Sequence, residues 1–189
     1  MTRTRWTLEE LLPVVVEVFL DKGYDATSME DIARATGRTK SSVYHHVSGK
    51  EELLRLALTR GVSGLAAVLD EPFEGRAGER LEHVLRRSVE VLAADLPYVT
   101  VLLRVRGNTE AEQWALARRR DIDRRLAALV RKAIDEGDLR DDLDPKTVSR
   151  LLFGQVNSLV EWWRPTGPAS VARTADTLVS LALEGLLRR

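Results

Sequence analysis

The side chains best suited to chemistry lie between residues 33 and 50, where basic and hydroxyl-bearing residues gather without any acid. The basic residues are Arg34, Arg38, Lys40 and Lys50. Short hydrogen-bonding side chains stand among them, namely Thr39, Ser41, Ser42, Tyr44, His45 and His46. Cations and hydroxyls suit phosphate oxygens, and compact polar groups let a helix approach base edges in the major groove. The composition therefore suits DNA, although three packed helices with a solvated basic face would also explain it.

Little in the remaining sequence indicates another chemistry. The 189 residues include no cysteine, which removes disulfides, thiolate metal sites and cysteine nucleophiles. His45 and His46 are neighbours that a helix would splay apart by ~100°, so they are not expected to share a metal. No Gly-x-Ser-x-Gly elbow, dinucleotide glycine fingerprint, phosphate loop or His-Glu-x-x-His motif is present. We expect no metal, no cofactor and no enzymatic activity.

Overall charge and hydropathy narrow the range of partners. Lys+Arg and Asp+Glu both total 29, so any site for a polyanion has to be local. The apolar stretch 11–20 is broken by Glu17, and no charge-free run of ~18 residues or cleavage site for a signal peptide follows. We expect a soluble, cytoplasmic chain with no membrane partner.

Helical periodicity runs almost from end to end and predicts an all-α fold of about nine helices. Thr7 and Glu10 have capping-box spacing for a first helix that Gly23 ends, and Ser28 and Asp31 repeat that spacing for a second. Pro13 is expected to kink the first helix near its first turn rather than break it. The other predicted helices cover residues 39–47, a longer segment opened by 48–51, and then 79–95, 98–105, 110–136, 145–163 and 168–187.

The second and third helices are joined by a tight turn at residues 36–38, where Gly37 can supply a left-handed residue. The runs 23–33, 37–47 and 48–54 closely resemble the DNA-binding domain of TetR-family transcriptional regulators. The glycines, Tyr44, His46 and Lys50 fall together at the family's spacing, and Phe19 stands where its first helix carries Phe. Ser41 replaces the usual Gly, which bears on base preference rather than on DNA binding.

The resemblance implies a helix-turn-helix domain over residues 1–52, with its fourth helix continuing to about residue 70 as a connector. A ligand-binding and dimerisation domain over 53–189 would follow. It also implies that Ile32, Ala33, Val43 and Val47 pack in a core. The side chains implied to face phosphates are Thr27, Ser28, Lys40, Tyr44, His46 and Lys50. Those implied at or near base edges are Arg38, Thr39, Ser41, Ser42 and His45.

Two C-terminal helices are apolar around most of their circumference and must be buried on more than one side. They are either central core helices or parts of a four-helix dimer interface. We favour a homodimer because an operator-binding helix-turn-helix usually needs two half-sites. The predicted interface stripes are Val148, Leu152, Val156, Leu159 and Trp163 on one helix, and Val171, Ala175, Leu178, Ala182 and Leu186 on the other.

Segments 137–145 and 162–168, with Gly154 and Asn157 between them, resemble the C-terminal domain of TetR-family members that sense acyl-CoA thioesters. Such a ligand needs an apolar tunnel and cations for its phosphates, although the arginines of 118–125 also fit a solvated, salt-bridged face. The predicted ligand residues are Leu103, Arg106, Trp114, Arg118, Phe153, Asn157, Trp162, Trp163 and Arg164. The prediction is a ligand-responsive repressor that binds a near-palindromic DNA operator as a dimer and is released by a small apolar or acyl-CoA-type effector. A drug-like effector, or a helical scaffold without DNA binding, is the alternative.

Overall fold

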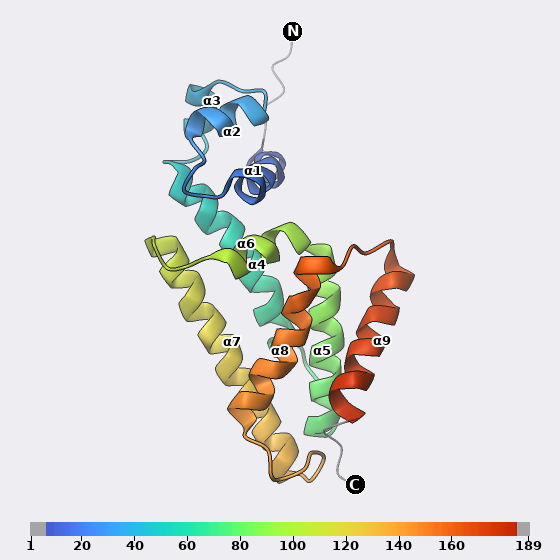
Figure 1. Ribbon diagram of the computed structural model, residues 1–189. Coiled ribbons are helices and arrows are strands. Elements are labelled where there is room, and N and C mark those ends of the chain that lie inside the picture. Colours follow the sequence, from blue (N-terminus) through green and yellow to red (C-terminus); the bar gives the residue numbers. More distant parts are fainter. Residues whose placement is uncertain (1–6, 185–189) are drawn as a thin grey trace. The chain divides into compact units, whose positions relative to one another are not determined.

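Figure 1 shows a computed structural model of the chain, which describes residues 7–184. Within these residues nine helices form, and extended structure is limited to a single bridge at Leu139, which confirms the all-α prediction. The helices are α1 (Leu8–Lys22), α2 (Met29–Ala35), α3 (Lys40–Tyr44), α4 (Lys50–Asp70), α5 (Ala77–Ala94), α6 (Leu96–Arg104), α7 (Glu110–Asp135), α8 (Pro145–Trp162) and α9 (Pro168–Glu184). Three predicted bounds were wrong, because α3 ends before residue 47, α5 begins before residue 79 and α6 begins before residue 98.

The helices belong to two compact units that interleave in the sequence. The first unit contains residues 7–62 and 97–116, and the second contains 63–96 and 117–184. The division falls inside α4 and α7, so each of these helices contributes to both units. This division concerns packing, and the functional boundary at residue 52 stays a prediction.

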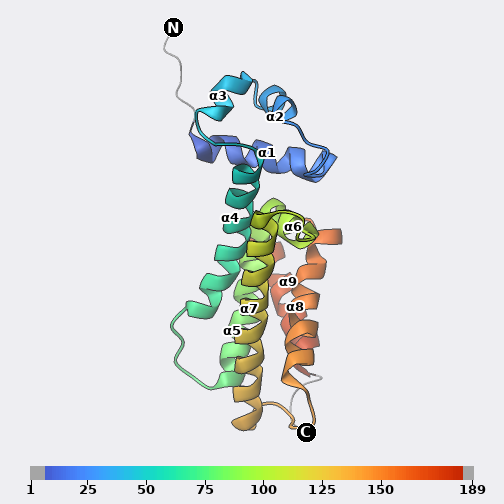
Figure 2. The same cartoon turned by 90° about the vertical axis from the view of Figure 1, so that its left-hand side faces the viewer.

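The first two helices begin at the predicted capping boxes. The Thr7 amide donates to Glu10 Oε2 over 3.0 Å, and the Glu10 amide donates back to Thr7 Oγ1 over 3.4 Å. Ser28 and Asp31 repeat the exchange at the start of α2, at 3.0 and 3.1 Å. Helix α1 continues through Pro13 to Lys22, and ends at Gly23 with a φ of 83°. These local signals set the ends of α1 and the start of α2 (Figure 2).

Buried aliphatic side chains fix α2 and α3 to the helices beside them. Ile32 of α2 and Val43 of α3 are almost fully buried in the first unit, and Ala33 and Val47 are buried too, as the resemblance implied. Full burial of one such side chain contributes about 1.5–3 kcal/mol, which outweighs the weak propensity of a five-residue helix. The core therefore holds α3 in place by one face and leaves its other face exposed.

In the second unit, α5 packs along α9 and also contacts α8 (Figures 1 and 2). Its buried stripe includes Leu81, Leu85 and Leu92. On another face, Arg86 forms ion pairs with Glu82 and with Asp176 of α9. The first turn of α5 is capped from the loop after α7, where Asp138 Oδ2 accepts from the Gly78 amide over 2.9 Å. These contacts fix α5 as the central helix against which α8 and α9 lie.

Candidate nucleic-acid interface

A short turn and a side-chain cap set the position of α3. Gly37 adopts a φ of 66°, and the Arg38 amide donates to the Ala33 carbonyl over 2.8 Å, which closes α2. Thr39 then caps α3 by accepting a 3.2 Å hydrogen bond from the Ser42 amide. The predicted helix-turn-helix is therefore present, with Arg38 half-buried at the turn.

The free face of α3 carries the polar side chains predicted to contact DNA. The exposed side chains are Thr39, Lys40, Ser41, Tyr44, His45 and His46. Ser42 is half-buried beside them, whereas Val43 and Val47 point into the core. This arrangement presents hydroxyl, imidazole and phenol groups together, the donors and acceptors that can bind phosphate oxygens and base edges.

Lys40 forms an ion pair with Glu30 of α2. The hydrogen bond from Lys40 lowers the pKa of Glu30, and the same bond raises the pKa of Lys40. Both side chains are exposed, so the pair is open to competition from another anion. A DNA phosphate would compete with the Glu30 carboxylate for Lys40.

Lys50 is held by the loop between α1 and α2. Its Nζ donates to the Tyr24 carbonyl over 2.8 Å and lies 4.3 Å from the centre of the Tyr24 ring. That ring stacks edge-on against Phe19 with 5.3 Å between ring centres. Burial raises the pKa of Tyr24, and the charges of Glu51 and Glu112 raise it further. Lys50 therefore stabilises the loop that leads into α2, in addition to any role on DNA.

Two predicted phosphate contacts before α2 have local structural roles. Thr27 is buried, and its hydroxyl donates to the Gly23 carbonyl over 2.7 Å. This placement does not suit the predicted phosphate contact, because the side chain closes the loop and does not reach the surface. Ser28 is exposed, and its Oγ caps α2 by accepting from the Asp31 amide.

The predicted ligand residues do not form a single pocket within either unit. Leu103, Arg106 and Trp114 belong to the first unit, and the others belong to the second. In the second unit Phe153 and Trp163 are buried, and Asn157 is half-buried. The remaining three, Arg118, Trp162 and Arg164, are exposed. Of the two neighbouring tryptophans, Trp163 is therefore buried and Trp162 is exposed. Their adjacency in the sequence does not show which of the two is buried.

The stripe predicted for dimerisation is mostly core, which corrects the sequence prediction. Val148, Leu152, Val156, Leu159, Trp163, Ala175, Leu178 and Ala182 are all buried within the single chain. Val171 is half-buried, and Leu186 lies outside the described residues. The stripe is covered because α8 and α9 both pack against α5 and against each other. A second copy would have to use another face of these helices.

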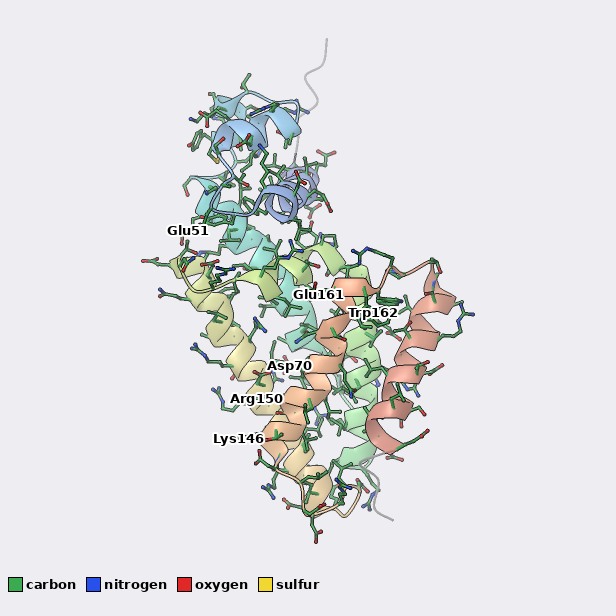
Figure 3. All side chains as sticks on the ribbon, in the orientation of Figure 1. Glu51, Asp70, Lys146, Arg150, Glu161 and Trp162 are labelled. Atoms are coloured by element: carbon green, nitrogen blue, oxygen red, sulfur yellow. The ribbon has the colours of Figure 1, made fainter. Side chains whose placement is uncertain are left out.

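That other face carries large exposed apolar side chains. Leu151, Trp162 and Leu181 are 64%, 66% and 73% exposed. Trp162 and Leu181 line a groove of 420 Å³ between α8 and α9, whose other lining residues are Gln155, Ser158, Leu159, Ser170, Arg173, Thr174, Thr177 and Leu178. Figure 3 marks Trp162 at the end of α8. The periodicity of the sequence predicts that α8 and α9 are apolar, but which of their faces stays exposed depends on tertiary packing.

Comparison with known proteins agrees with this architecture. The family described as bacterial regulatory proteins, tetR family, matches residues 11–57, and the tetracyclin repressor-like C-terminal domain matches 74–186. The repressor KstR2 of Mycobacterium tuberculosis is 26% identical over 95% of this chain and 92% of its own length. A TetR-family member from Streptomyces coelicolor A3 is 52% identical, covers 97% of this chain and 94% of its own, and has a TM-score of 0.89.

A further solved structure, AibR in complex with isovaleryl coenzyme A and operator DNA, has a TM-score of 0.78 at 24% identity. The match covers 93% of this chain and 97% of that one, and it supports the fold alone.

The helix-turn-helix and the all-helical second unit define a DNA-binding transcriptional regulator of the ligand-responsive class, not an enzyme. The chain belongs to the TetR family. None of the described helices is both long enough and apolar enough to span a bilayer. Within residues 7–184 no three His, Asp or Glu side chains gather as a metal site would require.

Proposed function

We propose that this regulator is a repressor that binds a near-palindromic operator as a homodimer, with one α3 in each of two successive major grooves. The observation that carries the proposal is the exposed polar face of α3 above a buried apolar face. Two such helices related by a two-fold axis would read two half-sites about one helical turn apart.

The proposed contacts divide into phosphate anchors and base contacts. Lys40, Lys50, Tyr44, His46 and Ser28 would contact phosphates. Arg38, Thr39, Ser41, Ser42 and His45 would lie at or near base edges. Replacing a phosphate anchor should weaken all DNA sequences about equally, whereas replacing Ser42 should change the preferred sequence.

For the homodimer we propose the exposed faces of α8 and α9 as the interface. Burying Leu151, Trp162 and Leu181 of both copies would remove three large apolar side chains per chain from water. Light scattering should give a mass twice the 21.2 kDa of one chain. The variant Leu181→Glu should shift this mass to the monomer, with Glu90→Gln on the surface of α5 as the control.

For the effector we propose an acyl-CoA or a similar elongated apolar acid derivative. AibR, which shares this fold, was solved in complex with isovaleryl coenzyme A, a thioester of this class. In this chain, the second unit has an apolar interior that also contains the buried Ser88 hydroxyl, which has no hydrogen-bond partner among the described residues. An effector carbonyl is one group that could pair with this hydroxyl.

One experiment tests both halves of the proposal. DNA fragments selected from a genomic library by the purified protein identify an operator, and fluorescence anisotropy then follows its release by short, long and aromatic acyl-CoAs and their free acids. Release should be about 5–150-fold, the usual allosteric range. Selection of no common sequence would contradict operator binding. Release by planar drug-like compounds alone would favour the other effector class.

A further inference from the structure

A groove between α7 and α8 in the second unit is lined mainly by cations. Its volume is 210 Å³, and its lining consists of Arg120, Asp123, Arg124, Ala127, Lys146, Ser149 and Arg150. Four of these side chains are basic and one is acidic. Figure 3 marks Lys146 and Arg150, which lie one turn apart on α8. The groove was not predicted from the sequence, because its two halves lie about 20 or more residues apart on different helices.

Two cations at or beside this groove have acidic partners. Arg124 pairs with Asp121, and Arg125 pairs with Asp70. By contrast, Arg120, Lys146 and Arg150 form no ion pair with any described residue. Asp123 lines the groove with them, and the charge of Lys146 contributes to lowering the pKa of Asp144, so part of the positive charge is balanced. Four basic side chains against one acidic one still leave the lining with an excess of positive charge, in a chain of zero net charge.

The number and spacing of these cations favour one ligand chemistry. A single carboxylate offers two oxygens and can satisfy one or two cations, whereas phosphate groups offer several oxygens in different directions. Lys146 lies in the first turn of the 18-residue helix α8, where the Asp144 carboxylate already accepts from the Thr147 amide, so the basic side chains and not the helix terminus would hold the ligand. A ligand carrying more than one phosphate group could contact both helices at once.

We infer that the α7–α8 groove binds the phosphate groups of a phosphate-bearing effector. This inference rests on the proposed function, in which the effector is an acyl-CoA, and it assigns the CoA moiety to Arg120, Lys146 and Arg150. The acyl part would then make its contacts elsewhere, so the groove contributes affinity for the CoA moiety rather than selectivity among acyl chains.

Titration calorimetry of the full chain provides the first test. The probes are isovaleryl-CoA and S-isovaleryl-pantetheine, which lacks the nucleotide phosphates. The variant K146Q/R150Q should bind isovaleryl-CoA about tenfold more weakly and S-isovaleryl-pantetheine unchanged. The variant K146Q/R150K, which keeps a cation at position 150, should bind isovaleryl-CoA more tightly than K146Q/R150Q does. The control Arg131→Gln removes an exposed cation of α7 outside the groove and should change neither affinity.

A second measurement separates this inference from the proposed function. Inorganic pyrophosphate is titrated while NMR follows the side-chain signals of Arg120 and Arg150. Shifts of these signals, absent for Arg131, support the groove as a phosphate site even if no acyl-CoA releases the operator. Absence of shifts overturns the groove even if acyl-CoAs do release it. An equal loss of affinity in Arg131→Gln would also overturn it, because the effect would then be one of overall charge.

Discussion

The cations of the helix-turn-helix and those of the α7–α8 groove differ in their partners. In the first unit Lys22 pairs with Asp31, Lys40 pairs with Glu30, and Lys50 donates to the Tyr24 carbonyl. In the groove, Arg120, Lys146 and Arg150 form no ion pair with a described residue. DNA phosphates therefore compete with existing partners of these lysines, whereas an anion that contacts Arg120, Lys146 and Arg150 breaks no ion pair of theirs. Removing the Glu30 carboxylate, which competes with DNA for Lys40, should consequently strengthen DNA binding.

Among the lysines of the first unit that already have partners, Lys50 should show the largest effect on DNA binding when it is replaced by Ala. We expect operator and unrelated DNA to bind about tenfold more weakly, because a charge-assisted phosphate contact is lost. The slope of log K against log salt should fall by about one unit. Fluorescence anisotropy at several salt concentrations measures both quantities.

The matched control is Lys22→Ala, which removes a paired cation of α1 that is not predicted to contact DNA. Its salt slope should equal that of the wild type. If Lys50→Ala weakens binding but retains the full salt slope, Lys50 acts only by holding the Tyr24 loop, and its assignment to phosphate is wrong.

Ser88→Ala tests the unpartnered polar group of the second unit. Elsewhere in the second unit, the hydroxyl of the buried Ser149 donates to the Lys146 carbonyl over 3.0 Å. Ser88 Oγ has no partner among the described residues. We expect Ser88→Ala to raise the free energy of unfolding by about 1 kcal/mol, since a buried unpaired hydroxyl is costly.

Denaturant unfolding measures this change, with Ser149→Ala as the matched control. That control should lower the free energy of unfolding or leave it unchanged, because it removes a satisfied hydroxyl. A clear destabilisation by Ser88→Ala would show that the hydroxyl has a partner in solution, and would remove the reason for assigning it to an effector.

Glu30→Gln should strengthen DNA binding by about threefold, the range of an exposed ion pair. The substitution frees Lys40 from its competing carboxylate and keeps the size of the side chain. Anisotropy on the selected operator measures the gain. The double variant E30Q/K40Q should lose the gain, and a gain that persists there would show that the effect does not act through Lys40. The control Glu17→Gln removes an exposed carboxylate of α1 and should bind the operator like the wild type, so an equal gain in it would attribute the effect to overall charge.

The sequence predicts features that depend on neighbouring residues and misses those that depend on packing. The boxes at Thr7 and Ser28 are local, so the starts of α1 and α2 could be found from spacing alone. The pair Lys40–Glu30 joins two helices across a turn, and no spacing rule predicts it. The α8 stripe has the right period for a buried face, but periodicity does not tell whether the same chain or a second copy covers it.

The smallest expected effect is that of Asp31 on the stability of α2, which should depend on pH. Its carboxylate accepts from Lys22 Nζ over 2.6 Å and from the Ser28 amide over 3.0 Å. The hydrogen bond from Lys22, followed by those from Ser28, holds the pKa of Asp31 well below its usual range. Because the folded pKa lies below the unfolded one, the stabilisation is complete above about pH 4 and declines as the pH falls further.

Hydrogen exchange of the α2 amides should therefore show greater protection in the wild type than in Asp31→Asn at about pH 6. The difference should shrink as the pH falls from about 4 towards 2, where the carboxylate begins to be protonated. Asp25→Asn is the control, since this exposed carboxylate forms no ion pair with a described residue and should leave α2 protection unchanged. If the difference between wild type and Asp31→Asn stays constant down to about pH 2, the contribution of Asp31 does not depend on its charge. The contact between Lys22 and Asp31 would then stabilise α2 through hydrogen bonding and packing, without a contribution from the charge of Asp31.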